Sequence, residues 1–308
     1  IGPHADKVNA RKMIMMAMTA SACLITTMPF MPSVALLLMI IGTEGAVSGM
    51  IWPPLMGWLS VGHQGRQLNK RITFFSFSAY FGSVIGYSIS GWLWSRWSSH
   101  LLPYITTVII VIGAIIMAAS AYHRKANPIG QQWDKTGKLP PEATIFRIMS
   151  IIAVIIAGAA FGTIQFPMVS LMKQMGFGPK IHAPIGASIG IAVMCGFFLL
   201  GRTTRWHYKK LFFWGIQVII AIMVLAISTS VSAWQLGVYS VAAAFGISVY
   251  FISDLYYAVS ITERRIHATA IHEICTSGGY MIGSFGGGVL AKLIGLRQIL
   301  SLIHISEP

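Results

Sequence analysis

The stretch GRTTRWHYKKLFFWGIQVIIAIMVLAIST, residues 201–229, carries the pattern that decides the fold of this chain. A short basic connector, 201–210, is followed by an uncharged and largely apolar run over 211–229. An α-helix rises about 1.5 Å per residue, so a run of this length crosses the hydrocarbon core of a bilayer, which is about 30 Å thick. The stretch therefore predicts a transmembrane helix that starts at a charged, water-facing connector.

The same pattern recurs along the whole chain. The mean hydropathy is +0.71, with 55% hydrophobic and 10% charged residues, and a soluble domain of 308 residues would need a far more polar surface. We predict an all-α membrane protein with about nine transmembrane helices. Their approximate spans are 13–31, 33–60, 72–94, 101–121, 146–171, 182–200, 211–229, 233–258 and 268–291.

The basic residues are concentrated in every second connector, which predicts the orientation in the membrane. Of the 22 Lys and Arg residues, 17 lie in one alternating set of connectors and 5 in the other. Cytoplasmic loops are enriched in Lys and Arg, so we expect the connectors at 62–71, 123–144, 201–210 and 260–267 to be cytoplasmic, in the inner or plasma membrane of a cell. Topology signals near acidic lipid headgroups explain the net charge of +14 better than a nucleic-acid partner does.

Two sets of landmarks repeat with nearly the same offset along the chain. Three glycines are spaced by four and five residues in one span and again in a later span. These glycines are Gly82, Gly86 and Gly91, then Gly279, Gly283 and Gly288. The pair Gly2 and Arg11 likewise has a counterpart in Gly201 and Lys210. Repeats of this kind are typical of transporters built from two parallel helical bundles.

The repeat predicts the domain organisation. We expect a partial N-terminal bundle over 1–122, a cytoplasmic loop over 123–144 and a partial C-terminal bundle over 145–299. In a protein of twelve spans this chain then holds spans three to eleven, and lacks the first two helices and the last. Residues 300–308 resemble the translation of a sequencing adapter and are left out of the fold prediction.

The opening residues resemble the signature loop of the major facilitator superfamily, which joins the second and third spans of those transporters. Gly2, Asp6, Lys7 and Arg11 match that motif, whereas Asn9 stands where the family has glycine. The resemblance extends over essentially residues 1–299 and implies the two-bundle transporter fold of the family. It also implies that the four matching residues form a gate on the cytoplasmic side.

A finer resemblance points to a group of bacterial facilitators whose substrate is unassigned. It is carried by Trp52-Pro53-Pro54, the segment from Arg71 to Trp92, Tyr256-Tyr257, and Arg265 through His272-Glu273 with the glycines that follow. Drug/proton antiporters of the superfamily carry a Gly-Pro pair in the fifth span. Here Gly86 is followed by Tyr87, which counts against drug efflux without excluding it.

Three acidic residues fall inside predicted spans, where a carboxylate is costly and marks a functional site by default. Glu44 lies near the membrane midplane and is our candidate for proton coupling or for the substrate cavity, with a structural hydrogen bond to a neighbouring helix as the alternative. Glu273 either binds a proton or substrate, or is satisfied by the N-terminus of its helix. The side chain of His272 is expected about 100° away from it, so the two do not pair on one face.

Asp254 is the third of these carboxylates, and two interpretations of it remain open. It forms a salt bridge with Arg264 or Arg265, or it belongs to a cytoplasmic gate or proton exit, with Tyr257 about one helical turn further on. We include Tyr257 among the substrate or proton candidates.

Two uncharged sites complete the candidates for substrate binding. Gln165 with Pro167 predicts a break in the helix, which is tolerated where the backbone lines a cavity, so Gln165 either binds substrate or bonds a neighbouring helix. Trp52 next to two prolines predicts a kinked helix with an aromatic ring that stacks on substrate or packs only.

Small residues at helical spacing allow two helices to approach closely. We expect Gly82 and Gly86, and likewise Gly279 and Gly283, to lie at such contacts.

The function that fits these residues is secondary active transport of a small solute by alternating access, coupled to protons. The alternatives are an efflux antiporter and a membrane sensor without transport on the same scaffold. We expect a monomer in the lipid bilayer, with a small-molecule substrate and protons as partners and no nucleic acid. No metal-spaced cluster, nucleophile elbow or phosphate loop is present, so we predict no enzyme, no cofactor and no metal site.

Overall fold

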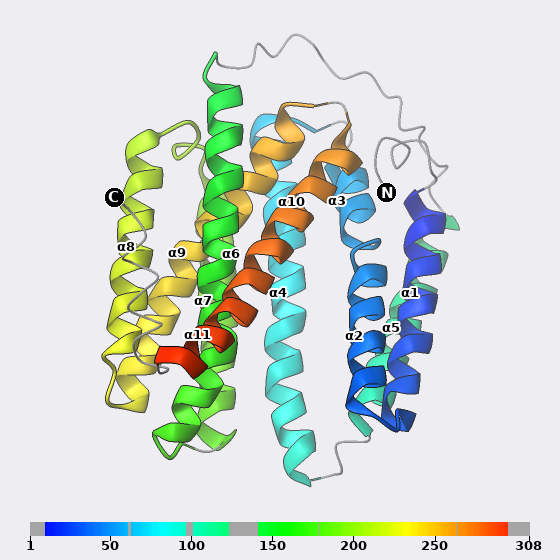
Figure 1. The fold of residues 1–308 in the computed structure, drawn as a ribbon. Helices are drawn as coiled ribbons and strands as arrows, with labels where there is room; N and C mark the ends of the chain where they lie inside the picture. The colour runs from blue at the N-terminus through cyan, green and yellow to red at the C-terminus, as the bar shows by residue number, and fades with distance from the viewer. Residues whose placement is uncertain are drawn as a thin grey trace. The chain divides into compact units, whose positions relative to one another are not determined.

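The computed structural model describes residues 10–60, 63–96, 101–122, 141–177, 179–262 and 264–294 (Figure 1). Within these ranges every regular element is a helix, which confirms the predicted all-α fold. The helices are α1 (Ala10–Thr27), η2 (Met28–Phe30), α2 (Val34–Ser48), α3 (Trp52–Ser60), α4 (Gly65–Arg96), α5 (Leu101–Tyr122), α6 (Ala143–Gln174), α7 (Pro179–Arg202), α8 (Lys210–Ser228), α9 (Ala233–Ser260), α10 (Arg265–Met281), η3 (Ile282–Gly286) and α11 (Gly287–Ile294).

Among the described residues, 8 helical stretches are long and apolar enough to cross a membrane, and they match the first eight predicted spans. The ninth, predicted at 268–291, is not one of them. There α10 ends at Met281 and the chain passes through a π-helical turn, η3, before α11 begins at Gly287. The helical backbone therefore continues through the predicted span, with one π-helical turn inside it.

The chain divides into two compact units, which we describe separately. The first contains α1, η2, α2, α3 and α5 together with 262–273, and the second contains α4 up to Gly91, α6 to α9 and the chain from Ile274 onward. This grouping follows contacts rather than chain order, so the division into halves at 123–144 stays a prediction.

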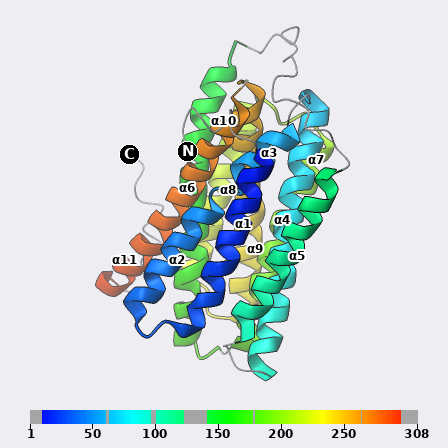
Figure 2. The same cartoon turned by 90° about the vertical axis from the view of Figure 1, so that its right-hand side faces the viewer.

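In the first unit, α1 packs between α2 and α5 (Figure 2). Hydroxyl groups join α1 to α5, since the Oγ1 atoms of Thr26 and Thr107 lie 2.9 Å apart. Helix α2 starts at Ser33, whose side chain accepts a hydrogen bond from the backbone of Leu36. The chain leaves the helix between α2 and α3, because Pro53 and Pro54 have no N–H to continue the backbone bonding.

In the second unit, α9 is the central helix and contacts α6, α7 and α8 (Figure 1). Two thirds of its most apolar window is buried, 67%, which is the largest share of any span. Ser232 caps its first turn by accepting from Gln235 N, and the side chain of Gln235 accepts in return from Val231 N at 3.0 Å. This reciprocal arrangement resembles a capping box and explains why the helix starts at Ala233.

The backbone of α6 closely approaches the end of α10 and the π-helical turn η3 in the second unit. A Cβ atom at Gly279 would collide with the carbonyl oxygen of Ile155, and one at Gly283 with that of Ala159. The contact coincides with the π-helical turn, where Thr163 Oγ1 donates a hydrogen bond of 3.1 Å to the carbonyl oxygen of Gly283. Glycine is therefore required at this crossing, because any side chain would separate the two helices.

The first glycine pair behaves differently from the prediction. A Cβ atom at Gly82 or Gly86 would meet nothing within 4 Å, so the helices of the unit that holds them make no close contact there. Glycine spacing alone does not select a packing face, because it only removes the obstacle to an approach that other side chains must drive.

Substitution of Gly283 by alanine tests the α6–α10 crossing. Gly283→Ala should lower the midpoint of thermal unfolding of the full-length protein in detergent by several degrees, since overpacking a tight contact costs about 1–3 kcal/mol. Gly278→Ala is the matched control, because a Cβ atom there meets nothing within 4 Å. Equal midpoints for the two variants would show that the crossing is not tightly packed.

Candidate functional site

Gln165 lies where three helices of the second unit bring polar side chains together. Its amide oxygen accepts a hydrogen bond of 3.0 Å from the hydroxyl group of Tyr87 on α4 and one of 3.4 Å from that of Tyr280 on α10. Gln165 itself comes from α6 and is half-buried. Within the described residues its amide nitrogen makes no hydrogen bond, so the group retains a donor for a ligand.

The predicted break near Gln165 is wrong. Helix α6 runs without interruption from Ala143 to Gln174, through Pro167. Proline removes one backbone hydrogen bond and disturbs the preceding turn, but a long helix packed against its neighbours keeps the rest of its bonds. The polar site is therefore made by side chains that meet across helices rather than by an opened backbone.

Glu44 is held by two serine hydroxyl groups in the first unit. Ser21 on α1 and Ser48 on α2 donate to the same carboxylate oxygen, over 2.8 and 2.6 Å. The carboxylate is half-buried and links α1 to α2. Ser48 lies one turn after Glu44 on the same helix. Of these two hydrogen bonds, the one from Ser21 therefore connects two helices.

Asp254 is fully buried in the second unit and has a different partner from the one expected. It forms an ion pair with Arg147 of α6, and Ser150 donates a hydrogen bond of 2.6 Å to the same carboxylate oxygen. The predicted pairing with Arg264 or Arg265 is thus wrong. Arg265 instead donates to the carbonyl oxygen of His63 at 3.2 Å, in the first unit.

The ion pair of Arg147 and Asp254 ties the two helices together from the inside. Arg147 Nη1 also donates to the carbonyl oxygen of Asp254 at 3.1 Å, so one guanidinium satisfies two acceptors of α9. The arginine side chain is 15% exposed and the aspartate 0%. A buried charge without a partner is costly, so loss of either residue would leave the other charge uncompensated.

Tyr257 lies at the same end of α9 and is fully buried within an aromatic cluster. Its hydroxyl oxygen accepts a hydrogen bond of 2.9 Å from the backbone N–H of Tyr208, in the connector between α7 and α8. Its ring packs against those of Phe146 and Phe213, with centroids 5.9 and 6.1 Å away. These contacts give Tyr257 a structural role in holding the connector, and its role toward substrate or protons stays a prediction.

His207 in the same connector is half-buried among aromatic rings. Its ring stacks on Tyr256 with centroids 4.0 Å apart and touches Trp206 at 4.1 Å, while its Nε2 atom is buried without a hydrogen-bond partner. Burial lowers the pKa of His207 to about 4, because the charged imidazolium would lose its hydration. The side chain is therefore neutral at physiological pH.

The remaining candidates lie in the first unit or outside the described residues. His272 is 6% exposed and Glu273 beside it is half-buried, as different faces of α10 require. Trp52 is 38% exposed at the start of α3. Nearby, Thr269 of α10 donates a hydrogen bond of 3.0 Å to the carbonyl oxygen of Pro53, which joins α10 to α3.

Only one residue of the predicted gate lies within the described part of the chain. Arg11 donates to the carbonyl oxygen of Ala118 at 3.0 Å, near the end of α5. A cation at a helix C-terminus is stabilised by the helix dipole. The other members, Gly2, Asp6 and Lys7, are outside the described residues, so the gate stays a prediction.

The sequence pointed to several of the polar residues at these sites, but it did not point to the side chains that bind them. Tyr87, Tyr280, Ser21 and Ser150 gave no signal beyond a hydroxyl group inside an apolar span. Arg147 does carry one, because it lies inside the predicted span 146–171, although the charge pattern groups it with the connector residues that set topology. Among the described residues, no group of three or more His, Cys, Asp or Glu side chains is placed to hold a metal ion.

Comparison with known proteins gives one family and one similar structure. A family profile described as Major Facilitator Superfamily matches residues 1–284. No curated protein sequence matches the chain at a significant level. The crystal structure of the human organic anion transporter MFSD10 (TETRAN) has a similar fold, with a TM-score of 0.70, 10% sequence identity, and coverage of 96% of this chain and 75% of that one. At this identity the similarity concerns the fold alone.

Removal of either member of the buried ion pair should destabilise the protein strongly. Asp254→Asn and Arg147→Met should each lower the free energy of unfolding of the full-length protein by about 3–5 kcal/mol, because a buried charge is left uncompensated. The double variant Arg147→Met/Asp254→Leu should recover most of the loss. The free energy of unfolding is measured in mixed micelles. A double variant that loses the sum of the two single losses would contradict a coupled pair.

The burial of His207 predicts an acid-sensitive stability. Its pKa is about 4 in the folded protein against about 6.5 when unfolded, so the unfolded state binds more protons between these values. Stability should therefore be complete above pH 6.5 and fall as the pH drops toward 4. The melting temperature of His207→Asn should change less between pH 7 and pH 5 than that of the wild type. His182→Gln is the matched control, and an unchanged acid dependence in His207→Asn would refute the prediction.

Proposed function

Since this chain belongs to the major facilitator superfamily and is a multi-pass membrane transporter, we propose that it moves a small solute by alternating access with coupling to protons. The family and its fold indicate a transporter rather than an enzyme. The observation that carries the proposal of proton coupling is the carboxylate of Glu44, held by hydroxyl groups within the span Val34–Ser60.

The geometry around Glu44 supports a link between protonation and helix position. Two hydroxyl groups donate to one oxygen of the carboxylate, and a hydrogen bond to an ionised acceptor is stronger than one to a neutral acceptor. Uptake of a proton removes the charge that strengthens both hydrogen bonds. Because one of the donors, Ser21, belongs to α1, protonation weakens the α1–α2 contact at this level. A change of that kind is what alternating access requires of a coupling residue.

The cluster of Tyr87, Gln165 and Tyr280 supports a polar contact with substrate. The three side chains come from α4, α6 and α10, and the amide nitrogen of Gln165 remains available as a donor. Solute sites in these transporters lie near the bilayer midplane and are formed by side chains of several helices. We therefore propose that the cluster binds a hydrogen-bond acceptor of the substrate. Trp52, His272 and Glu273 remain further candidates for contacts with substrate or protons.

Asp254 and Tyr257 are proposed to be structural rather than to carry protons. Asp254 is paired with Arg147 and accepts a hydrogen bond from Ser150, and Tyr257 is engaged with the backbone of Tyr208. A carboxylate that shuttles protons must exchange partners, whereas this one is locked to a guanidinium inside a single unit.

The arrangement of the protein in its membrane is part of the proposal. We place it as a monomer in the inner or plasma membrane, with the connectors at 62–71, 123–144, 201–210 and 260–267 in the cytoplasm. Residues 1–122 and 145–299 are taken as parts of the two bundles. Efflux and sensing without transport are the other functions that such a scaffold carries. The engagement of the Tyr87 hydroxyl, at the position where antiporters have proline, counts against efflux.

Proton coupling through Glu44 is tested in cells that carry the full-length protein. Candidate solutes from a panel of sugars, amino acids and organic acids are added one at a time. The solute that is transported should make the external medium more alkaline, as expected of symport. Glu44→Gln should abolish this alkalinisation and leave exchange of labelled solute, because exchange needs no net proton movement. Glu142→Gln, an exposed acid at the start of α6, is the matched control.

Three outcomes of that experiment would contradict the proposal in different ways. Solute-linked proton flux that persists in Glu44→Gln removes this residue from the mechanism. Lower intracellular dye on expression indicates efflux, and binding of solute without accumulation indicates a sensor.

A further inference from the structure

The Gln165 cluster, which consists of Gln165, Tyr87 and Tyr280, is built from uncharged side chains of three helices. Along α4, α6 and α10, the charged residue nearest to a member of the cluster is Glu273, seven residues before Tyr280. Seven residues correspond to about 10 Å along a helix axis. The helices that form the cluster therefore supply it with polar but neutral groups.

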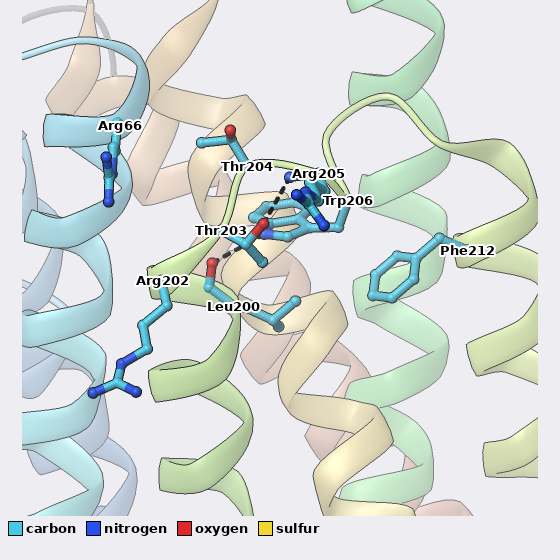
Figure 3. Close-up of a pocket in the computed structure, with 8 residues that line it drawn as sticks. All are labelled: Arg66, Leu200, Arg202, Thr203, Thr204, Arg205, Trp206 and Phe212. Atoms are coloured by element: carbon cyan, nitrogen blue, oxygen red, sulfur yellow. Dashed lines mark hydrogen bonds between the residues drawn. The ribbon is translucent and has the colours of Figure 1, made fainter.

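A group of basic side chains in the second unit lies far from this cluster. Figure 3 shows Arg66, Arg202 and Arg205 around a hollow of about 810 Å³ at the end of α7, with Arg202 directed away from the other two. Arg66 lies 21 residues before Tyr87 on the same helix, which is about 31 Å along its axis. These charges thus belong to the connector end of the unit and do not serve the Gln165 cluster.

The amide nitrogen of Gln165 is the accessible donor of the cluster. The amide oxygen accepts from both tyrosine hydroxyl groups, whereas the nitrogen makes no hydrogen bond within the described residues. This nitrogen is also absent from the buried side-chain atoms that lack a partner there, so it can be reached from outside the protein. Tyr87 is 40% exposed, which leaves the cluster open on the side of α4. Two amide N–H groups are therefore presented to a solute.

The two phenol groups add acceptors to this donor. A phenol oxygen that donates its hydrogen to Gln165 can itself accept a hydrogen bond. A hydroxyl group of a solute can accept from an amide N–H and donate to a phenol oxygen at the same time. A carboxylate has no hydrogen to donate, an ammonium group cannot accept, and either would bring a charge that the cluster does not compensate. The cluster therefore matches a neutral hydroxyl group best.

Tyr280 is held in place by its surroundings. Its ring packs against that of Phe161 with centroids 5.9 Å apart, and its carbonyl oxygen accepts a hydrogen bond of 2.7 Å from Ser284. A Cβ atom at Gly162 would collide with the same carbonyl oxygen, so backbone contact fixes Tyr280 against α6 about one turn before Gln165. A solute that binds between Gln165 and Tyr280 thus needs to order little of the site, which favours affinity.

We propose that the Gln165 cluster binds a hydroxyl group of a neutral, hydroxyl-bearing solute of the polyol or monosaccharide class. The solute hydroxyl accepts from the amide nitrogen of Gln165 and donates to the phenol oxygen of Tyr280 or Tyr87. The inference rests on the proposed function, the transport of a small solute, and names the chemical class of that solute.

Binding to the purified full-length protein tests the solute class without requiring transport. Thermal unfolding and equilibrium binding are measured in a detergent that has no sugar headgroup. The neutral probes are a panel of polyols and monosaccharides that includes sorbitol, glucose and ribose. The charged probes are succinate and benzoate as anions and choline as a cation. At least one neutral probe should bind and raise the melting temperature, and the charged probes should do neither.

Deoxy analogues locate the hydroxyl group that the cluster binds. They are made from the neutral probe that binds best and compared on the wild type and on Gln165→Leu. One analogue should bind the wild type about tenfold more weakly than the parent, because its absence of a hydroxyl leaves the amide without an acceptor. In Gln165→Leu the parent and this analogue should bind equally.

Conservative variants keep the result interpretable if Gln165→Leu does not fold. Tyr280→Phe keeps the ring and removes the hydroxyl group, and should reduce the difference between the parent and the deoxy analogue. Tyr239→Phe is the matched control, because Tyr239 is a half-buried tyrosine of α9 outside the cluster. This control should bind both probes like the wild type.

The outcomes separate the solute class from the transport proposal. Binding of the charged probes alone, or of no probe, would overturn the neutral class. A preference for the parent that is unchanged in Gln165→Leu and in Tyr280→Phe would remove the cluster from the binding site. Binding of a neutral probe that cells never take up would contradict transport and leave the solute class standing. Proton-linked uptake of an organic acid that Gln165→Leu does not alter would support transport and reject the class.

Discussion

The lack of water inside a bilayer is the constraint on which this structure depends. Every backbone N–H and C=O group within the hydrocarbon core must find a partner in the protein, and a helix satisfies them all within one segment. This explains why each regular element in the described part of the chain is a helix. It also explains why each buried polar side chain there is informative, since it must be satisfied by a neighbour or else serve a ligand.

The second unit shows how the constraint organises packing. Helix α9 is surrounded by α6, α7 and α8, and the charge of Asp254 at its end is neutralised by Arg147 rather than left to water. Gly279 of α10 and Gly283 of η3 let the backbone there meet that of α6, and the carbonyl oxygen of Gly283 accepts a hydrogen bond from Thr163. Charge pairing and close backbone contact thus act in the same unit, and both fail if a side chain of the wrong size or charge is introduced.

The polar groups divide into those that are saturated and those that retain capacity. Asp254 and Tyr257 each have a strong partner within the unit, which supports the structural role proposed for them. Among the described residues, Gln165 keeps an amide donor, and Glu44 is bound by hydroxyl groups that do not neutralise it. A transporter needs both kinds of group, since a rigid scaffold must hold residues that change partners during the cycle.

The sequence by itself determined the class of fold, eight membrane-spanning stretches and the family, because hydropathy and charge patterning are set by the bilayer and act on each segment alone. It also picked out Glu44, Asp254 and Gln165, because a polar group in an apolar run is costly wherever the run packs. Only the tertiary structure decided the partners: Arg147 instead of Arg264 or Arg265 for Asp254, Ser21 for Glu44, and Tyr87 with Tyr280 for Gln165. Those pairs depend on how helices far apart in the chain rotate and cross. That rotation is determined by side-chain packing over whole helix faces, and it cannot be read from residue spacing within one segment.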